Sequence, residues 1–313
     1  MNRTNEAPCR YCGGPAKPWM QTRDWNQRVS AEIFNYIRCD NCGLVSLSAI
    51  PEDLAPYYPK NYHTIPQGAR PRPGQRKISG LIAHLRTIRR QRSEQRKLDL
   101  LLRFISRGKL LEIGPSWGGF SQAAKNAGFD VDVIEMNPEC RRFLSDVLHV
   151  NVLEGANENT ALRKAGLYDA IVLWQVLEHL KCPWEILDEL ASKLKPGGYL
   201  AIGTPNPDSL QRRVFGSRWL HVDAPRHVTL IPVAWPQRVL GRHGLRAVLA
   251  TATDKPNRDF NAVGWRSSLS NALPKQISFL SKALGLGLSI LAYPVESFSW
   301  LGSCYTIILK KDA

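Results

Sequence analysis

The sequence lacks an apolar run long enough to cross a lipid bilayer. Two uncharged runs near the C-terminus, 283–295 and 297–309, hold 13 residues each and are separated by Glu296, whereas a spanning helix needs about 20 apolar residues. The chain also lacks an opening basic segment followed by an apolar stretch, which is the pattern of a secretory signal. In a chain with seven cysteines, these absences lead us to expect a protein of the reducing cytoplasm.

Acidic residues are too few to balance the basic ones, and the formal net charge at pH 7 is +15. The excess is concentrated in residues 70–109, which hold thirteen lysines and arginines against Glu94 and Asp99. Apolar residues recur there at three- and four-residue spacing, which predicts an amphipathic helix over 78–107 with an arginine-rich outer face. Three roles for that face stay open. It is a solvated surface, a contact surface for RNA phosphates, or a docking surface for an anionic lipid or a phosphorylated glycan carrier.

The distribution of residues predicts two units of unequal size. We expect residues 1–70 to form a small cysteine-bounded module with a Pro- and Tyr-rich linker, and residues 71–313 to form a larger domain. In the larger domain, short apolar runs alternate with helical patterns, which predicts an α/β fold with a doubly wound parallel sheet. An apolar, glycine-containing segment at about 262–302 predicts a helical insertion before the last strand, CYTIILKK.

The junction LLEIGPSWGGF, at 110–120, carries the strongest local signal. A small-residue turn between a buried strand and a helix lets a ligand approach backbone N–H groups at the start of the helix. The next predicted strand ends in Glu135, 23 residues after Glu112, and a carboxylate there can accept both hydroxyls of an adenosine ribose. By itself this pattern predicts a nucleotide-binding fold.

Four ordered motifs within residues 95–313 resemble those of class I S-adenosylmethionine-dependent methyltransferases, which have a seven-stranded Rossmann-like sheet. Besides Glu135, they are the acidic-x-Gly-x-Gly-x-Gly motif, with Ser116 in place of its middle glycine, and the runs YDAIVLWQVLEHL and LKPGGYLAIGTPN. The resemblance implies S-adenosylmethionine as the cofactor. The cofactor residues that it implies are Glu112, Gly114, Ser116, Gly118, Glu135, Trp174 and Gln175, with Glu154 or Asn157 near the adenine.

The resemblance also implies a role for each of these residues. Gly114 and Gly118 would line the methionine and ribose side, while Trp174 and Gln175 would end a strand beside the sulfonium. Glu112 would organise the glycine turn and the cofactor ammonium, although an acid at a strand end can also be purely structural.

Two cysteine pairs bound the N-terminal module. Cys9 and Cys12 form one Cys-x-x-Cys pair, Cys39 and Cys42 form the other, and a glycine follows each pair. Four thiolates at this spacing predict a zinc-ribbon-like module with one structural Zn²⁺, which would stabilise a unit too small for a core of its own. Disulfides or buried free thiols are the alternatives.

A cysteine-rich module ahead of this domain is similar to those of sugar methyltransferases from deoxysugar and surface-polysaccharide pathways. The segment WLHVDAPRHVTLIP, at 219–232, resembles a substrate-facing element of the same group. A histidine suits a general base because it titrates near neutral pH, and His227 is preferred because this segment lies on the substrate side; a histidine that only caps or packs is the alternative. The other candidates are Glu178 and His179 for catalysis, His221 as a third histidine, and Asp223 and Arg226 for hydroxyls or phosphate of a sugar nucleotide.

We therefore expect methyl transfer to an O, N or C atom of a sugar-containing or related small metabolite, free or carrier-linked. The main alternative is an rRNA or tRNA methyltransferase whose zinc module and basic helix contact RNA, although the chain lacks the Asn/Asp-Pro-Pro-Tyr type of base-pocket motif. A peripheral membrane contact through residues 277–300 is a further hypothesis. The alternative for the same residues is a lid packed over the substrate. A fold that only binds the cofactor or a partner is the non-enzymatic alternative.

Overall fold

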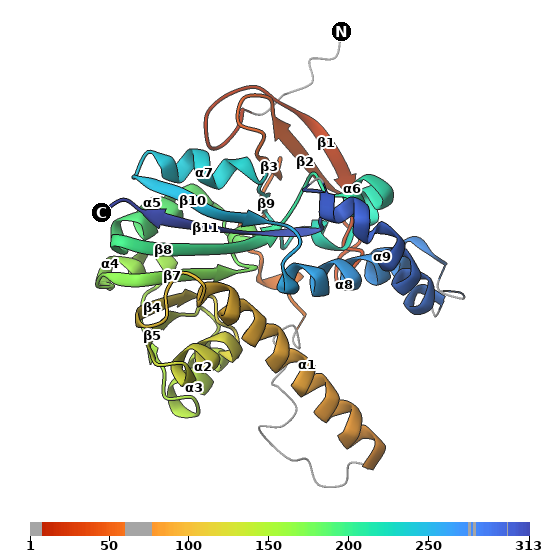
Figure 1. Cartoon of the computed structure of the whole chain (residues 1–313). Coiled ribbons are helices and arrows are strands. Elements are labelled where there is room, and N and C mark those ends of the chain that lie inside the picture. Colours follow the sequence, from red (N-terminus) through yellow and green to blue (C-terminus); the bar gives the residue numbers. More distant parts are fainter. Residues whose placement is uncertain (1–7, 60–76, 275–276, 278–279, 299) are drawn as a thin grey trace.

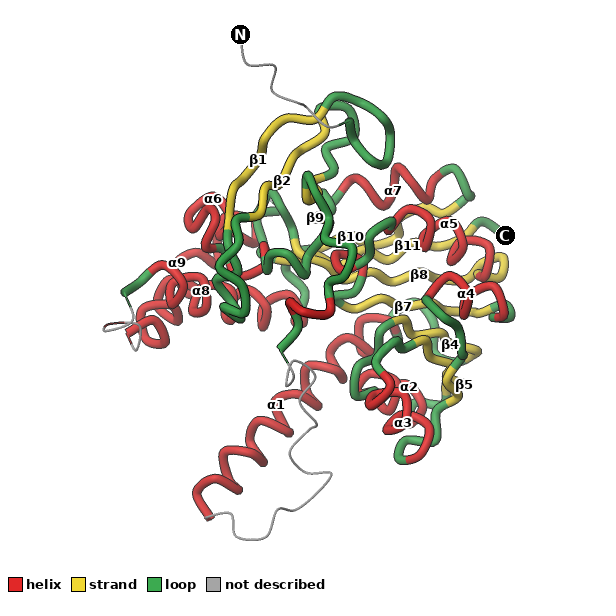
Figure 2. The backbone as a smooth tube through the Cα atoms, turned by 180° about the vertical axis from the view of Figure 1, so that it is seen from behind, coloured by secondary structure: helices red, strands yellow, loops and turns green. Residues whose placement is uncertain are grey.

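Two β-sheets organise the chain (Figures 1 and 2). The computed structural model describes residues 8–59, 77–274, 277, 280–298 and 300–313. The larger sheet has seven strands in the order β10-β11-β8-β7-β4-β5-β6, and the smaller sheet has four in the order β1-β2-β3-β9. The predicted domain boundary near residue 70 lies outside the described residues.

The larger sheet is mixed, because one inserted strand reverses its direction. Strands β4 to β8 pair in parallel, while β11 pairs antiparallel with both β8 and β10. The seven-stranded α/β sheet implied by the resemblance is therefore confirmed, while the expectation of a wholly parallel sheet is wrong because β11 runs antiparallel to its neighbours. Its strands are β4 (Gly108–Ile113), β5 (Phe129–Ile134), β6 (Asn151–Val152), β7 (Tyr168–Trp174), β8 (Leu194–Pro205), β10 (Leu245–Thr251) and β11 (Cys304–Lys311).

Helices cover both faces of this sheet (Figures 1 and 2). Neighbouring strand residues such as Leu110 and Leu111 belong to different apolar clusters, because successive side chains point to opposite faces. One face is covered by α1 (Lys77–Leu101), α2 (Gly119–Asn126) and α3 (Pro138–Asp146). The other is covered by α4 (Glu158–Lys164), α5 (Pro183–Lys193) and α7 (Ala234–Gly241).

The strand order reverses between β4 and β7. From β4 the chain proceeds outward to β5 and β6, and it then crosses to β7 and β8 on the other side of β4. In open α/β sheets, ligands bind outside the carboxyl ends of the strands at such a reversal. The ends of β4, β5 and β7 therefore define where a cofactor site is expected.

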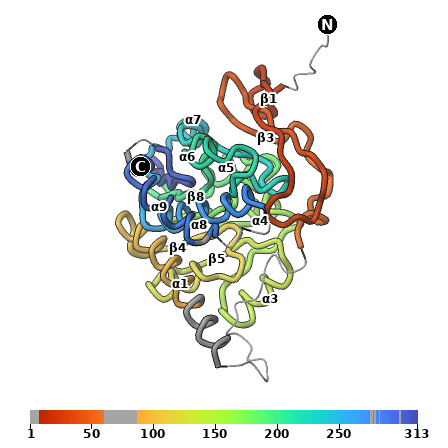
Figure 3. Tube along the Cα trace, turned by 90° about the vertical axis from the view of Figure 1, so that its right-hand side faces the viewer, coloured from red at the N-terminus to blue at the C-terminus, as the bar shows by residue number. Residues whose placement is uncertain are grey.

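The N-terminal module shares its sheet with the larger domain. Its strands β1 (Ala16–Thr22), β2 (Phe34–Cys39) and β3 (Val45–Leu47) are extended by β9 (Thr229–Leu230) from the segment that follows β8. Tyr36 packs in an apolar cluster with Trp219 and Val222, and its hydroxyl donates to the carbonyl of His227 at 2.6 Å. Figure 3 shows this module lying along one side of the molecule. The small module and the segment 219–232 therefore form one unit.

Two helix boundaries differ from the sequence predictions. The basic helix ends at Leu101 rather than at residue 107, because Leu102, Phe104 and Ile105 turn back onto the apolar cluster under α2. The helical insertion begins at Lys255 rather than near residue 262, because the side chain of Asp254 caps the helix by accepting from the backbone N–H of Asn257. The remaining helices are α6 (Leu210–Phe215), α8 (Lys255–Ala272) and α9 (Ser281–Phe298), with 3-10 turns η1 (Ala55–Tyr57), η2 (Leu177–His179), η3 (Gly216–Arg218) and η4 (Leu220–Val222).

Candidate active site and cysteine cluster

The turn after β4 is tied to the end of β5 by Glu135. The backbone N–H of Ser116 donates to Oε2 of Glu135 at 2.9 Å, and the N–H of Asn137 donates to Oε1 at 2.8 Å. Ser116 has a φ of +52°, a left-handed conformation that is costly for a residue with a side chain and is concentrated at functional sites. Glu135 therefore holds the turn in place at the edge of the sheet.

Glu112 supports the same turn from inside the core. Its carboxylate accepts a hydrogen bond from the hydroxyl of Ser121 on α2, which joins β4 to the first turn of that helix. Burial raises the pKa of Glu112 to about 8, against the opposing effect of the Ser121 hydrogen bond. The position supports the expected role of organising the turn.

The two motif glycines make room for protein neighbours. A Cβ on Gly114 would lie 2.7 Å from Cγ2 of Val176, and a Cβ on Gly118 would lie 2.5 Å from Cδ2 of Leu144 on α3. Their missing side chains therefore let the turn pack closely against the end of β7 and against α3. That both glycines also line the cofactor stays a prediction.

Trp174 and Gln175, at the end of β7, have different environments. The Trp174 ring is buried in the core, 5.7 Å from the ring of Phe120 between centroids, and its place beside a sulfonium stays a prediction. Gln175 is half-buried and has a φ of +58°, and its backbone N–H donates to the carbonyl of Gly203 at 2.8 Å. Gln175 is therefore the residue of this pair that the fold presents at the strand end.

The two adenine candidates also differ. Glu154 is exposed and lines a shallow surface hollow together with Arg141 and Asn151. Asn157 caps α4, where its side chain accepts from the backbone N–H of Thr160 at 2.9 Å. Because the Asn157 side chain already has this structural role, Glu154 is the better candidate.

Glu178, His179 and His227 converge at the ends of β7 and β8. One side-chain N or O atom from each residue lies within 4.8 Å of those of the other two. The rings of His179 and His227 meet edge to face, with centroids 4.6 Å apart. The sequence predicted these three residues as catalytic candidates, and the fold brings them together from η2 and from the segment before β9.

Backbone carbonyls fix the proton positions on the two histidines. Nδ1 of His227 lies 2.8 Å from the carbonyl of His221, and Nδ1 of His179 lies 3.1 Å from the carbonyl of Arg226. Because a carbonyl oxygen only accepts, each Nδ1 carries the hydrogen and each Nε2 keeps a lone pair. Burial lowers the pKa of His179 to about 3 and that of His227 to about 4, so both rings are neutral at pH 7. The expectation that these histidines titrate near neutral pH is therefore wrong.

Glu178 is fully buried beside the two rings. Its Oε2 accepts from the hydroxyl of Thr204 at 3.0 Å, while Oε1 has no hydrogen-bond partner among the described residues. Burial raises the pKa of Glu178 to about 8. The cluster therefore combines two imidazoles that can accept a proton with a carboxyl that is mostly protonated at neutral pH.

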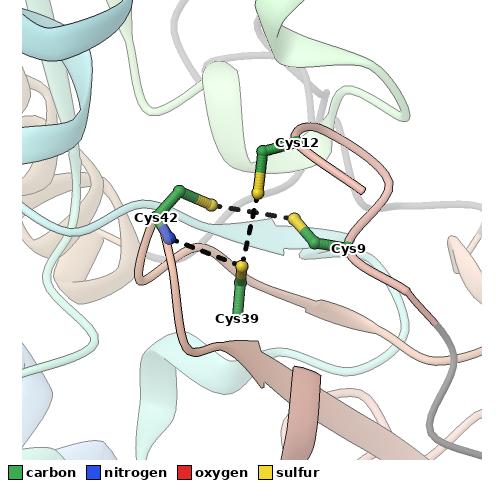
Figure 4. Close-up of side chains that lie close together, drawn as sticks. All are labelled: Cys9, Cys12, Cys39 and Cys42. Carbon is green, nitrogen blue, oxygen red and sulfur yellow. Dashed lines mark hydrogen bonds between the residues drawn. The ribbon is translucent and has the colours of Figure 1, made fainter. Parts of the chain in front are cut away.

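The four cysteine sulfurs of the N-terminal module face one another (Figure 4). Sγ of Cys9 lies 3.7 Å from that of Cys42, Sγ of Cys12 lies 3.5 Å from that of Cys39, and all four lie within 4.8 Å of one another. A tetrahedral zinc site with Zn–S bonds of about 2.3 Å has S···S edges of about 3.8 Å, whereas a disulfide bond is about 2.05 Å long. The donor set fits one tetrahedral metal ion.

A glycine turn shapes each cysteine pair. Gly13 and Gly43 have φ values of +69° and +75°, which glycine adopts at no steric cost. Their backbone N–H groups donate to the carbonyls of Cys9 and Cys39 at 2.8 and 3.0 Å. These turns direct both sulfurs of each pair to the same side.

A comparison with known protein families matches the part of the chain that contains the turn after β4. The sequence model of a methyltransferase domain family matches residues 85–250, which is more than half of the chain. The chain belongs to this methyltransferase family. The match includes the turn, Glu135 and η2, and it leaves the N-terminal module and the α8–α9 insertion outside.

Relatives of the methyltransferase domain resemble it over part of their length. A ubiquinone biosynthesis O-methyltransferase of Xanthomonas axonopodis pv. citri is 29% identical over 119 residues, which are 36% of this chain and 50% of that protein. The protein of the same name from Xanthomonas oryzae pv. oryzae is 28% identical over 125 residues, 38% of this chain and 52% of that protein. The chain thus spans about half the length of these curated relatives.

Solved methyltransferase structures are similar at lower identity. A SAM-dependent methyltransferase from Archaeoglobus fulgidus is 20% identical with a TM-score of 0.49, over 71% of this chain and 94% of that one. The N-methyltransferase NodS of Bradyrhizobium japonicum, in complex with S-adenosyl-L-homocysteine, is 17% identical with a TM-score of 0.42. The match covers 72% of this chain and 87% of that one.

Arg226 and Asp223 join the methyltransferase domain to the N-terminal module. Arg226 is fully buried, with Nη2 2.6 Å from Asp24 and 2.7 Å from Asp223. Although burial opposes it, hydrogen bonds from Arg226 lower the pKa of Asp223 to about 2. The prediction that Arg226 binds a sugar nucleotide is therefore wrong, because its guanidinium is fully buried and already paired with two carboxylates. The same role for Asp223 stays a prediction.

The sequence reasoning missed two hydroxyl groups of the site. The hydroxyl of Tyr58 lies 3.1 Å from Nδ1 of His179, and the hydroxyl of Thr204 donates to Glu178. Tyr58 follows η1 in the Pro- and Tyr-rich linker, and nothing in its local pattern indicates a contact with a residue 121 positions away. His221, the third histidine candidate, is buried and positions His227 through its carbonyl.

The raised pKa values predict that stability depends on pH. Glu112 and Glu178 have a usual pKa of 4.5 and a folded-state pKa of about 8. The folded protein therefore keeps protons that the unfolded chain releases. The contribution of these two groups to the free energy of unfolding is fully present below about pH 4.5 and is lost as the pH rises through about 8. The buried histidines, with pKa values lowered to about 3–4, have the opposite effect on stability below about pH 6.5 and are neutral in both states above about pH 7. We therefore expect the Tm to fall between about pH 7 and pH 9 by at least about 2–4 °C, which corresponds to about 1 kcal/mol.

Differential scanning calorimetry of the wild type and of Glu178→Gln across this pH range checks the expectation. The amide of the variant cannot titrate, so its Tm should fall less steeply. The exposed Glu139 offers a control, and Glu139→Gln should behave as the wild type. Equal slopes for Glu178→Gln and the wild type would contradict the assignment of a protonated Glu178.

Proposed function

We propose that the chain is an S-adenosylmethionine-dependent methyltransferase that acts on an O, N or C atom of a sugar-containing or related small metabolite, free or carrier-linked. The observation that carries the proposal is the convergence of Glu178, His179 and His227 next to the turn after β4, since Val176 packs against Gly114. A cofactor at the turn and an acceptor at the histidines would then lie side by side. The family match supports the same reaction class.

The cofactor would be held by the turn and by the strand ends around it. Glu135 is the ribose ligand in this proposal, Gln175 faces the reacting end, and Glu154 lies on the adenine side. When bound, S-adenosylmethionine supplies an electrophilic methyl group. The protein's contribution is then to align the acceptor with that group and to remove the acceptor proton.

His227 is the proposed general base. Its Nδ1 hydrogen is engaged by the His221 carbonyl, so Nε2 is the atom that accepts the proton from the acceptor's reacting atom as the new bond forms. His179, held by Tyr58 and by the Arg226 carbonyl, positions the neighbouring ring. Protonated Glu178 can donate a hydrogen bond to the acceptor or to an imidazole, which a carboxylate cannot.

The acceptor class rests on the resemblance to sugar methyltransferases. The decisive experiment is a labelled-methyl transfer screen over nucleotide sugars, glycolipids, quinone precursors and ribosomal RNA. Transfer to a sugar-containing molecule is the expected result. Transfer to RNA alone would contradict the proposed acceptor class without affecting the methyltransferase assignment.

Replacing Glu135 with alanine is expected to weaken S-adenosylmethionine binding by about 10- to 100-fold, the effect of losing a charge-assisted hydrogen-bond acceptor worth about 1.5–3 kcal/mol. The change also removes the acceptor of the Ser116 N–H, so the turn loses its anchor. Isothermal titration calorimetry measures the affinity. Glu139→Ala, four residues later at an exposed position of α3, is the matched control, and equal affinities for the two variants would refute the assignment.

The proposal also assigns one structural Zn²⁺ to Cys9, Cys12, Cys39 and Cys42. All four positions of a tetrahedral site would be occupied by protein thiolates, which is the pattern of structural rather than catalytic zinc. The sulfur spacing described above supports this assignment.

A further inference from the structure

The exposed apolar side chains of the chain are concentrated on the α8–α9 hairpin. Of the fifteen large hydrophobic residues that are exposed in the described part, nine lie between positions 277 and 300. Ile290 and Leu291 on α9 are 66% and 77% exposed. The others are Ile277, Leu280, Leu284, Leu286, Tyr293, Val295 and Trp300. An exposed apolar group of this size marks a contact surface.

The hairpin packs through its small and polar residues, which leaves the leucines outside. A Cβ on Gly285 would lie 2.6 Å from Cα of Arg266, so the glycine permits close approach of α9 to α8. Glu296 is buried and accepts from Nε1 of Trp265 at 2.9 Å and from Nε2 of Gln211 at 3.1 Å. This arrangement is the reverse of a helix that buries its apolar face in a core.

A basic helix lies beside this apolar surface. Arg96 on α1 forms an ion pair with Asp259 on α8 at 2.5 Å, and Arg89, Arg90 and Arg92, one to two turns earlier on α1, are exposed. Figures 1 and 2 show that the free end of α1 and the hairpin project to the same side of the molecule. The exposed apolar side chains of α9 and the exposed arginines of α1 therefore lie on the same side of the molecule.

We propose that this face, made of α9 and the exposed arginines of α1, docks on the surface of a membrane rich in anionic phospholipid. Apolar side chains that enter the headgroup region and arginines that contact phosphates are the two components of peripheral membrane binding. Charge favours this occupant over a second copy of the chain, because pairing two such faces would bring like charges together in a protein of net charge +15. Among the described helices, none is long and apolar enough to cross a bilayer, so the contact is peripheral.

Vesicle flotation of the full chain tests the docking without any methyl-transfer assay, so its outcome is independent of the proposed function. We expect binding to mixed phosphatidylglycerol and phosphatidylcholine vesicles, weaker binding in high salt, and little binding to pure phosphatidylcholine. The double variant Ile290→Glu with Leu291→Glu should bind these vesicles at least about tenfold more weakly than the wild type. Arg89→Glu with Arg90→Glu should lose binding to the anionic vesicles.

Val147→Glu with Leu167→Glu is the matched control, because these residues are 55% and 52% exposed and lie outside the docking face. This variant should bind as the wild type, and circular dichroism should show the same fold for all variants. Wild-type protein that stays with the soluble fraction, or an Ile290→Glu/Leu291→Glu variant that floats as well as the wild type, would overturn the proposal. If the wild type is a dimer, the Ile290→Glu/Leu291→Glu variant is a monomer, and neither protein binds vesicles, the face would be assigned to contact with a second copy instead.

Discussion

The Cys39→Ser protein is expected to lose its zinc and to be strongly destabilised. Structural zinc contributes about 10–16 kcal/mol of binding free energy in zinc-finger peptides, and that energy is coupled to folding. Cys39 is buried with Cys9 and Cys42 in the cluster that also contains Ile231 and Trp235, so losing the metal would disturb the larger domain as well. We expect less than one zinc per chain in elemental analysis and a Tm lower by about 10 °C or more.

Cys182→Ser is the matched control for this prediction. Cys182 is a half-buried cysteine at the start of α5, outside the four-sulfur cluster, so its variant should keep both zinc and stability. Wild-type protein purified without any bound metal, or a Cys39→Ser protein with full zinc content, would exclude the metal site.

Methyl transfer by the Cys39→Ser protein is expected to fail together with its folding. The strand β3 pairs with β9 through Ser46 and Thr229, and β9 begins two residues after His227. A module that loosens when the metal is lost therefore releases one wall of the catalytic cluster.

The His227→Ala protein is expected to lose about 10²- to 10⁴-fold in kcat, the usual contribution of a general base. The calorimetric affinity for S-adenosylmethionine should stay within about twofold, because His227 lies on the acceptor side of the site. Burial keeps the pKa of His227 at about 4, so the wild-type rate should not fall between about pH 8 and pH 6, where an ordinary histidine becomes protonated.

Two further histidine variants separate a base from a residue that positions it. His179→Ala removes the ring that packs against His227 and is expected to lower kcat less than His227→Ala does. His243→Ala removes a surface histidine paired with Asp188 and should leave the rate unchanged. Full activity in His227→Ala, with loss in His179→Ala, would transfer the role of base to His179.

Local patterns predicted those parts of the molecule that are local in the sequence. The alternation of apolar runs and helical segments predicts the sheet because each strand and helix has its own periodicity. The Cys-x-x-Cys spacing likewise brings two sulfurs together within one turn, and the acid at the end of β5 is identified by its place after an apolar run. None of these inferences needs information from a distant part of the chain.

The contacts that local patterns could not predict join distant segments. Arg226 looks like a free cation in the sequence, and only the fold reveals that Asp24, 202 positions away, neutralises it. The environment of Trp174 depends on which face of β7 its side chain occupies. A shift of the strand register by one residue would move the side chain to the opposite face. Tyr58 reaches His179 only because η1 packs beneath the segment before β9, where Arg226 donates to the carbonyl of Tyr57.

The Arg226 ion pair has a consequence for exchanging parts between proteins of this kind. A chimera that takes its first 59 residues from another source must supply a carboxylate where Asp24 stands, because the guanidinium of Arg226 has no exposed surface. Without that acid, Nη2 of Arg226 would lose one of its two buried carboxylate partners, and Asp223 would remain as the other. The compatibility of the two halves thus depends on a buried acidic residue in the module that also holds the four-cysteine cluster.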